Sequence, residues 1–185
     1  MKKYWMAALG AALMAVVQCR KQVDEDFLIN KEQVGKLLRG SKASEVATLF
    51  QGDSVVVDST AGQFGGSGKR INLFEKGGKP LLLLSTASDS TELIENIRVL
   101  DSRYSTAEGV GLNSTFKDIQ QHYPIRKIVT SLNNIVVFVK GQDFYFTISR
   151  DQLPASLRYT ADLQVEEVQI PDQARIKYLM VGWQP

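Results

Sequence analysis

Apolar and polar residues alternate along most of the chain, which predicts a protein built mainly of short β-strands. The pattern is clearest at residues 144–148, where Phe144, Phe146 and Ile148 fall on one face of a strand because side chains alternate with period two. Residues 81–84 are four consecutive leucines without alternation, which predicts burial on both sides. Other apolar runs predict further strands at residues 27–29, 54–58, 71–75, 94–100, 127–131, 135–139, 163–170 and 175–183.

A helical spacing of apolar residues interrupts the strand pattern twice. In the first case Ala43, Val46 and Phe50 fall on one helix face, at positions i, i+3 and i+7. Ser41 precedes them and is a residue type preferred at the N-cap. The spacing predicts a short helix that must be held by packing against a sheet, because an isolated helix of this length is marginal in water.

The second predicted helix has the same design. Phe116, Ile119 and Tyr123 form its apolar face, and Thr115 and Asp118 have the spacing of a capping box. We expect Phe116 to lie beneath the helix and to pack against the apolar face of the hairpin that follows it.

The chain contains this helix-and-hairpin pattern twice. Residues 114–123 align with 41–50 at an offset of 73 (114 − 41), and residues 135–141 align with 71–77 at an offset of 64 (135 − 71). The change of offset predicts an extra surface loop around residues 62–68 in the first copy.

Internal repeats of this kind constrain the architecture more strongly than any short motif. The repeat predicts an α+β fold: a tandem duplication of a β-α-β-β-β unit, forming a mostly antiparallel sheet with two short helices packed on it. The strands at 27–29 and 94–100 would lead the two copies, which span about residues 27–85 and 94–149. C-terminal strands would close the fold.

The first residues have the composition of an export signal. Lys2 and Lys3 precede an apolar run over residues 4–17, which is shorter than the roughly 20 residues of a membrane-spanning helix and typical of a signal peptide. The run is followed by Cys19, the only cysteine, with the aliphatic Val16 three positions before it. This arrangement resembles a bacterial lipobox, in which the cysteine thiol is lipidated and becomes the mature N-terminus.

The resemblance to a lipobox implies three segments: a signal peptide over residues 1–18, a lipidated polar tether over 19–26, and a single α+β domain over 27–185. It also implies a membrane partner, reached through the lipid on Cys19. Gln18 differs from the Gly, Ala or Ser that the lipobox prefers before the cysteine. The alternatives are an ordinary cleaved signal and an uncleaved anchor.

Charge and cysteine content exclude several classes of partner. The full chain has 22 Lys and Arg against 20 Asp and Glu, and loss of two lysines with the signal peptide leaves 20 against 20 (22 − 2). A nucleic-acid-binding domain needs a basic surface, so we expect no nucleic-acid partner. One cysteine allows no intramolecular disulfide and no thiolate metal site, and the fold must therefore depend on an ordinary hydrophobic core.

Candidate catalytic, cofactor-binding and metal-binding residues do not form a recognisable site in the sequence. His122 is the only histidine, which excludes a multi-histidine metal centre. Glu166 and Glu167 are adjacent in a predicted strand and would point to opposite faces. The glycine-rich residues 65–69 lack the spacing of a phosphate-binding loop, and the carboxylates at 24–26 lie in the tether. We expect no enzyme and no cofactor.

Tyrosines are the residues most suited to a binding surface, because aromatic side chains are enriched at interfaces. The tyrosines concerned are Tyr104, Tyr123, Tyr145, Tyr159 and Tyr178. Most lie in predicted strands or at a helix end, where half-buried packing explains them equally well. Tyr145 lies on the face of its strand opposite Phe144 and Phe146.

Two stretches carry a family resemblance: residues 97–102 (Ile-Arg-Val-Leu-Asp-Ser) and 109–118 (Gly-Val-Gly-Leu-Asn-Ser-Thr-Phe-Lys-Asp). They resemble a family of small bacterial envelope lipoproteins described as regulated by the extracytoplasmic stress sigma factor. The similarity covers about residues 30–123, with a further match near 177–183. It implies an α+β fold in the periplasm on a lipid anchor, with no catalytic residue or ligand to carry over.

These observations predict a non-enzymatic lipoprotein of the cell envelope, anchored to the outer membrane and facing the periplasm. It would act as a protein-binding or assembly module with another envelope protein as its partner. One alternative is a carrier of a small apolar or envelope-derived ligand, and a more distant one is a hydrolase with an unrecognised site. An enclosed apolar cavity on the order of several hundred Å3 would favour the carrier, and an exposed apolar patch ringed by polar residues would favour the binding module.

Overall fold

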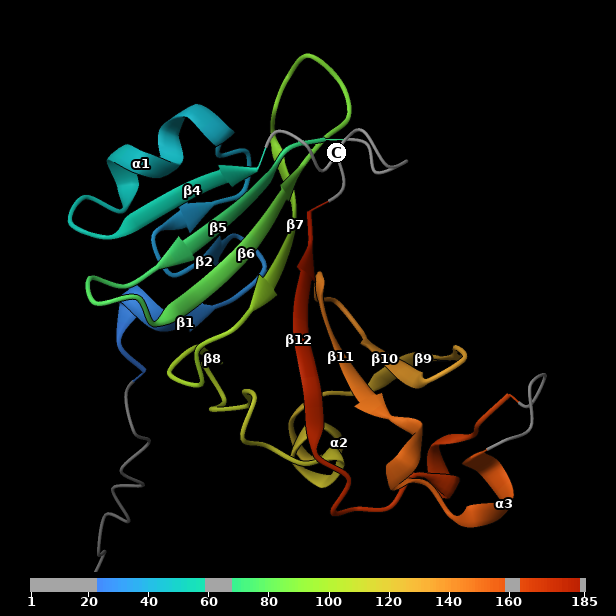
Figure 1. The fold of residues 1–185 in the computed structure, drawn as a ribbon. Coiled ribbons are helices and arrows are strands. Elements are labelled where there is room, and N and C mark those ends of the chain that lie inside the picture. The colour runs from blue at the N-terminus through green and yellow to red at the C-terminus, as the bar shows by residue number, and fades with distance from the viewer. Residues whose placement is uncertain (1–22, 59–67, 159–163, 184–185) are drawn as a thin grey trace, which may run out of the picture.

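A computed structural model describes residues 23–58, 68–158 and 164–183, and it confirms an α+β fold with mostly antiparallel strands. Eight strands form one sheet in the order β4-β5-β6-β7-β12-β11-β10-β9 (Figure 1). All neighbouring strands in this large sheet are antiparallel. Their bounds are β4 Ser54–Asp58, β5 Arg70–Phe74, β6 Pro80–Thr86, β7 Ile94–Val99, β9 Ile125–Thr130, β10 Asn134–Val139, β11 Phe144–Ser149 and β12 Ile176–Gly182.

A second, smaller sheet has four strands in the order β3-β2-β1-β8. It packs on the first half of the large sheet, and Figure 1 shows β1 and β2 behind β5 and β6. Ile29, Val34 and Leu37 from this sheet are buried in the same core as the strands of the large sheet. The bounds are β1 Leu28–Ile29, β2 Gln33–Val34, β3 Leu37–Leu38 and β8 Ser105–Thr106.

Two short helices cover the same face of the large sheet, which we call the inner face. The first is α1 (Val46–Leu49), which continues the 3-10 turn η2 (Ala43–Glu45), and the second is α2 (Phe116–His122). Their apolar residues join one continuous core with the strands. No helix in the described ranges is long and apolar enough to cross a membrane. The remaining helical turns are η1 Glu25–Phe27, η4 Arg150–Gln152, α3 Ala155–Arg158 and η5 Glu167–Gln169.

The large sheet consists of two halves with the same order of elements. The helix α1 is followed by β4, β5, β6 and β7, and α2 is followed by β9, β10, β11 and β12. Consecutive strands are neighbours within each half. The halves join where β7 pairs with β12, with Arg98 opposite Met180 and Ile97 opposite Val181. Both predicted copies therefore contain a helix followed by a hairpin, in the same order.

One strand of the predicted repeat has a different place in the structure. Residues 94–100 were expected to lead the second copy, but β7 pairs with β6, where Ile97 lies opposite Leu84, and it is the fourth strand of the first half. Its counterpart in the second half is β12. The expected leader of the first copy, residues 27–29, contributes β1 to the small sheet. Each half is thus α-β-β-β-β. The alternation within residues 94–100 predicts a strand but does not determine which strand it pairs with.

The two predicted helix caps have different outcomes. Ser41 does not cap the first helix, because its hydroxyl accepts a hydrogen bond from the Leu38 N–H (3.1 Å) in the preceding turn. The capping box of the second helix is confirmed, since the Thr115 N–H donates to Asp118 Oδ2 (2.7 Å).

The strand predicted at residues 163–170 is wrong for its described part, 164–170, which forms coil and the 3-10 turn η5. Its alternating sequence resembles a strand, but only Val165 and Ile170 are buried, and Val168 is 88% exposed. The described segment therefore packs on the core through two side chains and does not pair with a neighbouring strand.

The fold also begins before residue 27, the predicted first residue of the domain. Asp24 caps η1, because its side chain accepts a hydrogen bond from the Asp26 N–H (3.1 Å). Asp26 forms an ion pair with Lys36 (3.4 Å). These carboxylates therefore belong to the folded domain.

Candidate binding surface

The face of the large sheet that points away from the helices, which we call the outer face, is open. Along each strand the side chains alternate between the two faces. On β7, for example, Ile97 and Val99 are buried on the inner face, whereas Arg98 between them is half-buried on the outer face.

One row of the outer face runs straight across all eight strands, because its members are cross-strand partners of one another. None of them is buried. At about 4.8 Å per strand spacing, the row is about 34 Å long. In order from β4 to β9 the outer row is Val56, Asn72, Leu83, Arg98, Met180, Tyr145, Phe138 and Lys127.

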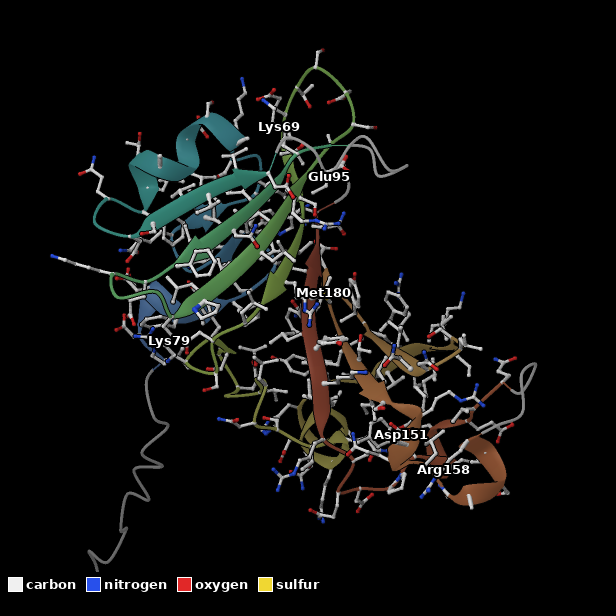
Figure 2. All side chains as sticks on the ribbon, viewed as in Figure 1. Lys69, Lys79, Glu95, Asp151, Arg158 and Met180 are labelled. Carbon is white, nitrogen blue, oxygen red and sulfur yellow. The ribbon has the colours of Figure 1, made fainter. Side chains whose placement is uncertain are left out.

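Arg98 and Met180 lie at the centre of the outer row, where the two halves of the sheet meet; Figure 2 labels Met180 on β12. The guanidinium carbon of Arg98 lies 3.8 Å from the centre of the Tyr178 ring. The Arg98 Nε is buried without a hydrogen-bond partner, and the guanidinium forms no ion pair with any residue in the described part of the chain. The cation is therefore held in place by an aromatic ring and not by a counter-charge.

Aromatic and cationic side chains also lie on the part of the outer face between β12 and β9. The rings of Phe138 and Tyr145 lie 5.1 Å apart with an interplanar angle of 32°, and the Arg126 guanidinium lies 5.5 Å from the Phe138 ring. Burial raises the pKa of the Tyr145 hydroxyl above its ordinary value. Lys177 Nζ lies 5.2 Å from the Tyr178 ring.

A hollow of about 550 Å3 adjoins this end of the outer row. Asn96, Arg126, Val136, Phe138 and Tyr145 are among the residues that line it. Because Asn96 and Arg126 are exposed, the hollow opens to solvent. The outer face thus combines a long row of half-buried side chains with a concave end.

A second hollow, of about 330 Å3, lies near the start of β7 and the end of β12. Ala87, Leu93, Ile94 and Trp183 contribute its apolar wall. Exposed residues such as Asp89 also line it, so this hollow opens to solvent as well. Neither hollow is the enclosed apolar cavity that a ligand carrier would need.

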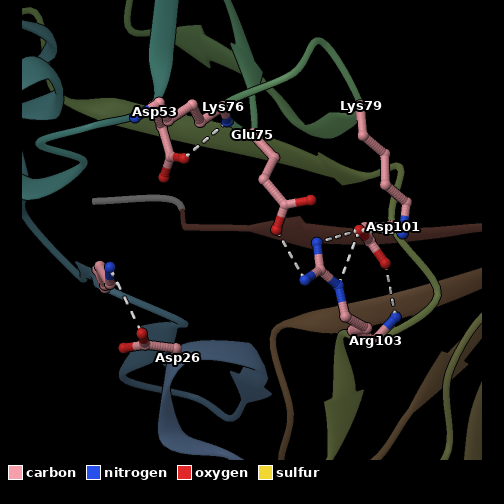
Figure 3. A network of polar contacts seen from close by, with 8 residues as sticks. Asp26, Asp53, Glu75, Lys76, Lys79, Asp101 and Arg103 are labelled. Carbon is pink, nitrogen blue, oxygen red and sulfur yellow. Dashed lines mark hydrogen bonds and ion pairs between the residues drawn. The ribbon is translucent and has the colours of Figure 1, made fainter.

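Asp101, a carboxylate whose pKa is strongly lowered, lies away from the outer face, in a cluster of charged residues (Figure 3). Its side chain is fully buried, and Arg103 (2.6 Å) and Lys79 (2.9 Å) form ion pairs with it. Arg103 also pairs with Glu75 (2.8 Å) in the turn between β5 and β6. Burial alone would raise the pKa of Asp101, but hydrogen bonds from Arg103 and Lys79 lower it to about 2.

A perturbed pKa can indicate an active site or a structural ion-pair network. In this cluster the buried carboxylate has partners for its charge, and neither of the two hollows described above reaches it. The cluster joins the β5–β6 turn to the segment after β7. We therefore assign it a structural role.

The tyrosines predicted as candidates for a binding surface divide between the core and the outer face. Tyr104 and Tyr123 are buried, and the Tyr123 ring packs edge-on against Phe144 at 5.2 Å. Tyr145 and Tyr178 are half-buried on the outer face, within the candidate surface. Tyr159 lies outside the described residues.

The residues considered for chemistry are not brought together. His122 is exposed at the end of α2, and its side chain makes no hydrogen bond within the described ranges. Glu166 and Glu167 are also exposed, in coil and in η5. No cluster of metal-ligating side chains occurs among the described residues. Cys19, the predicted lipidation site, lies outside them.

The sequence did not single out Arg98 or Met180. Period-two alternation could have placed each on the face opposite its buried neighbours, as it did for Tyr145. The missing information was the register between β7 and β12, whose residues are about eighty positions apart in the chain. Only that register makes Arg98 and Met180 neighbours.

Comparison with known proteins adds little to this geometry. No protein-family model matches the chain, and no curated protein matches it. The chain is similar in structure to the uncharacterized protein yfeY from Escherichia coli, with a TM-score of 0.48 and 13% sequence identity. The similarity covers 83% of this chain and 98% of yfeY. The resemblance to envelope lipoproteins regulated by the stress sigma factor stays a prediction.

Proposed function

We propose that the protein is a non-enzymatic lipoprotein of the bacterial cell envelope that binds another envelope protein through the outer face of its large sheet. The observation that supports this function is the outer row, in which eight adjoining side chains on eight strands are all left unburied. Arginine, methionine and aromatic residues are enriched at protein interfaces, and these types occupy the centre of the row.

The dimensions of the outer face suit a protein partner. A typical specific interface buries about 800 Å2 on each partner, which corresponds to a patch about 28 Å across. The outer row is about 34 Å long. A small ligand would need a more enclosed site, and the two hollows described above both open to solvent.

A photo-crosslinking residue at the centre of the outer face tests this function. Replacing Met180 by p-benzoylphenylalanine, and irradiating cells of the source organism, is expected to give a discrete crosslinked species on a denaturing gel. The matched control is the same replacement at Val168, which is 88% exposed but lies away from the large sheet. Identical products from the two positions, or no product from Met180, would contradict the proposed binding surface.

The lipid anchor has its own test. Cells grown with radiolabelled palmitate are expected to label the wild-type protein and to leave Cys19→Ser unlabelled, because the thiol is the acceptor in a lipobox. The expected change is complete loss of label at equal protein abundance, measured by immunoprecipitation and autoradiography. Equal labelling of both proteins would show that Cys19 is not the anchor.

A further inference from the structure

We infer that the partner places a carboxylate on Arg98, so that the binding surface recognises an acidic segment of a protein. This inference rests on the proposed function and names the chemistry of its partner.

Arg98 differs from the other partly or fully buried arginines in the described part of the chain, which are Arg39 and Arg150. Arg39 pairs with Asp143. Arg150 donates to backbone carbonyls, including that of Leu157 (2.7 Å). Arg98 has neither a carboxylate nor a carbonyl acceptor within the described residues. The buried Nε is out of reach of a partner, so the terminal Nη nitrogens are the donors that Arg98 can offer.

The setting of Arg98 prepares it for a carboxylate. A guanidinium is a planar fork that binds a carboxylate through two parallel hydrogen bonds. Contact with the Tyr178 ring restricts the guanidinium, which reduces the side-chain entropy that binding would otherwise cost. The partly desolvated position also strengthens an ion pair relative to one fully exposed to water.

The neighbouring charges favour the same partner. Lys177 and Arg126 place two more cations on this half of the outer face. Asp143, in the turn at the edge of the hollow, is already paired with Arg39. An acidic segment that extends from Arg98 across the second half of the sheet therefore meets an excess of positive charge.

The apolar members of the outer row distinguish a protein from other anionic partners. Leu83 and Met180 flank Arg98 in the row, and they suit aliphatic or aromatic side chains beside the acidic residue. A nucleic acid is held mainly through many phosphate contacts, whereas the outer row offers a single central cation between apolar neighbours. This composition resembles an interface hot spot, in which a central arginine is surrounded by apolar contacts.

The test uses a display library of random 12-residue peptides as the probe. The full chain, purified in detergent and immobilised, is compared as wild type, Arg98→Gln, Tyr145→Ala and Arg175→Gln. Arg175 is exposed and lies outside the outer row, so Arg175→Gln is the control for an equal loss of charge. Thermal unfolding of each variant first verifies that it is folded.

The wild type and Arg175→Gln are expected to retain the same peptides, enriched in Asp or Glu beside an apolar residue. The best of these, made with its acidic residue changed to the amide, is expected to bind at least tenfold more weakly, equivalent to 1.4 kcal/mol. Arg98→Gln is expected to cause the same loss, and the two changes together no further loss. This lack of additivity would show that the two groups contact each other.

Two outcomes separate failure of the inference from failure of the proposed function. Peptides lost with Tyr145→Ala but retained by Arg98→Gln would overturn the acidic partner and leave the binding surface in place. If Arg98→Gln and Tyr145→Ala each retain the same peptides as the wild type, or if the wild type retains no peptide, the acidic partner and the binding surface are both overturned. Binding of a single-stranded 20-nucleotide DNA that depends on Arg98, with no peptide retained, would assign the face to a nucleic acid and would also overturn both.

Discussion

Truncating Phe116 to Ala is expected to lower the free energy of unfolding by about 3–5 kcal/mol, as is typical for removal of a buried aromatic side chain. Phe116 is fully buried and is the first residue of α2. The helix has seven residues, so packing and not intrinsic propensity must hold it. The loss would be a large share of the 5–15 kcal/mol of stability typical of a domain. Chemical denaturation of the purified variant measures it.

His122→Ala is the control on the same helix. His122 is exposed at the last position of α2, so its loss is expected to cost about 1 kcal/mol or less. A larger destabilisation from His122→Ala than from Phe116→Ala would contradict the predicted core. Loss of a measurable activity with unchanged unfolding would instead give His122 a functional role.

Most strands of the large sheet could be predicted because apolar residues alternate with more polar ones along each strand, which marks its buried face and its exposed face. In β11, Phe144, Phe146 and Ile148 are buried on the inner face, as the alternation predicted. In the leucine run of β6, Leu81, Leu82 and Leu84 are buried, but Leu83 is half-buried on the outer face, so the predicted burial on both sides is wrong at that position. Local pattern therefore predicted the strands of the large sheet and, for most of them, the buried face.

Pairing between distant strands could not be predicted in the same way. Residues 94–100 have the alternation of a strand, which is equally consistent with leading the second half or ending the first. Contacts of β7 with both β6 and β12 decide between the two. The small sheet was missed for a related reason: its strands have two residues each, too few for a period to show.

The candidate surface depends on the same long-range register. Local pattern placed Tyr145 opposite its buried neighbours and Tyr123 on an apolar helix face, but nothing local distinguished Tyr178 from Tyr104, which the core buries. The outer row exists only because seven successive strand pairings bring its members into line. A one-residue shift in any pairing would turn part of the row toward the core.

The division of the large sheet into two halves explains why the surface has its centre at their junction. Each half alone would be a four-stranded sheet with β7 or β12 as an unprotected edge. Such edges tend to pair with another strand, and in this chain they pair with each other. The junction buries Ile97 and Val181 on the inner face and leaves Arg98 and Met180 on the outer face. The same pairing thus completes the core and forms the centre of the binding surface.

Replacing Asp101 by Asn is expected to lower the free energy of unfolding by about 2 kcal/mol at pH 7, and the difference from wild type is expected to disappear near pH 2. The shape of the side chain is kept, but Arg103 and Lys79 lose a buried counter-charge. The lowered pKa of Asp101, about 2 against an ordinary 3.8, corresponds to about 2 kcal/mol at roughly 1.4 kcal/mol per pKa unit.

The direction of the pH dependence follows from proton binding. Between about pH 4 and pH 2 the unfolded chain binds a proton at Asp101 before the folded chain does, because the folded pKa of about 2 is the lower one. The contribution of Asp101 is therefore complete above about pH 4 and is lost as the pH falls toward 2.

Glu75→Gln is the control in the same cluster: Glu75 is 37% exposed, so its ion pair with Arg103 is expected to contribute less than about 1 kcal/mol. Denaturation of the three proteins at pH 7, 4 and 2 measures these effects. A deficit for Asp101→Asn that is the same at pH 2 as at pH 7 would show that the lost stability comes from packing and not from the charge.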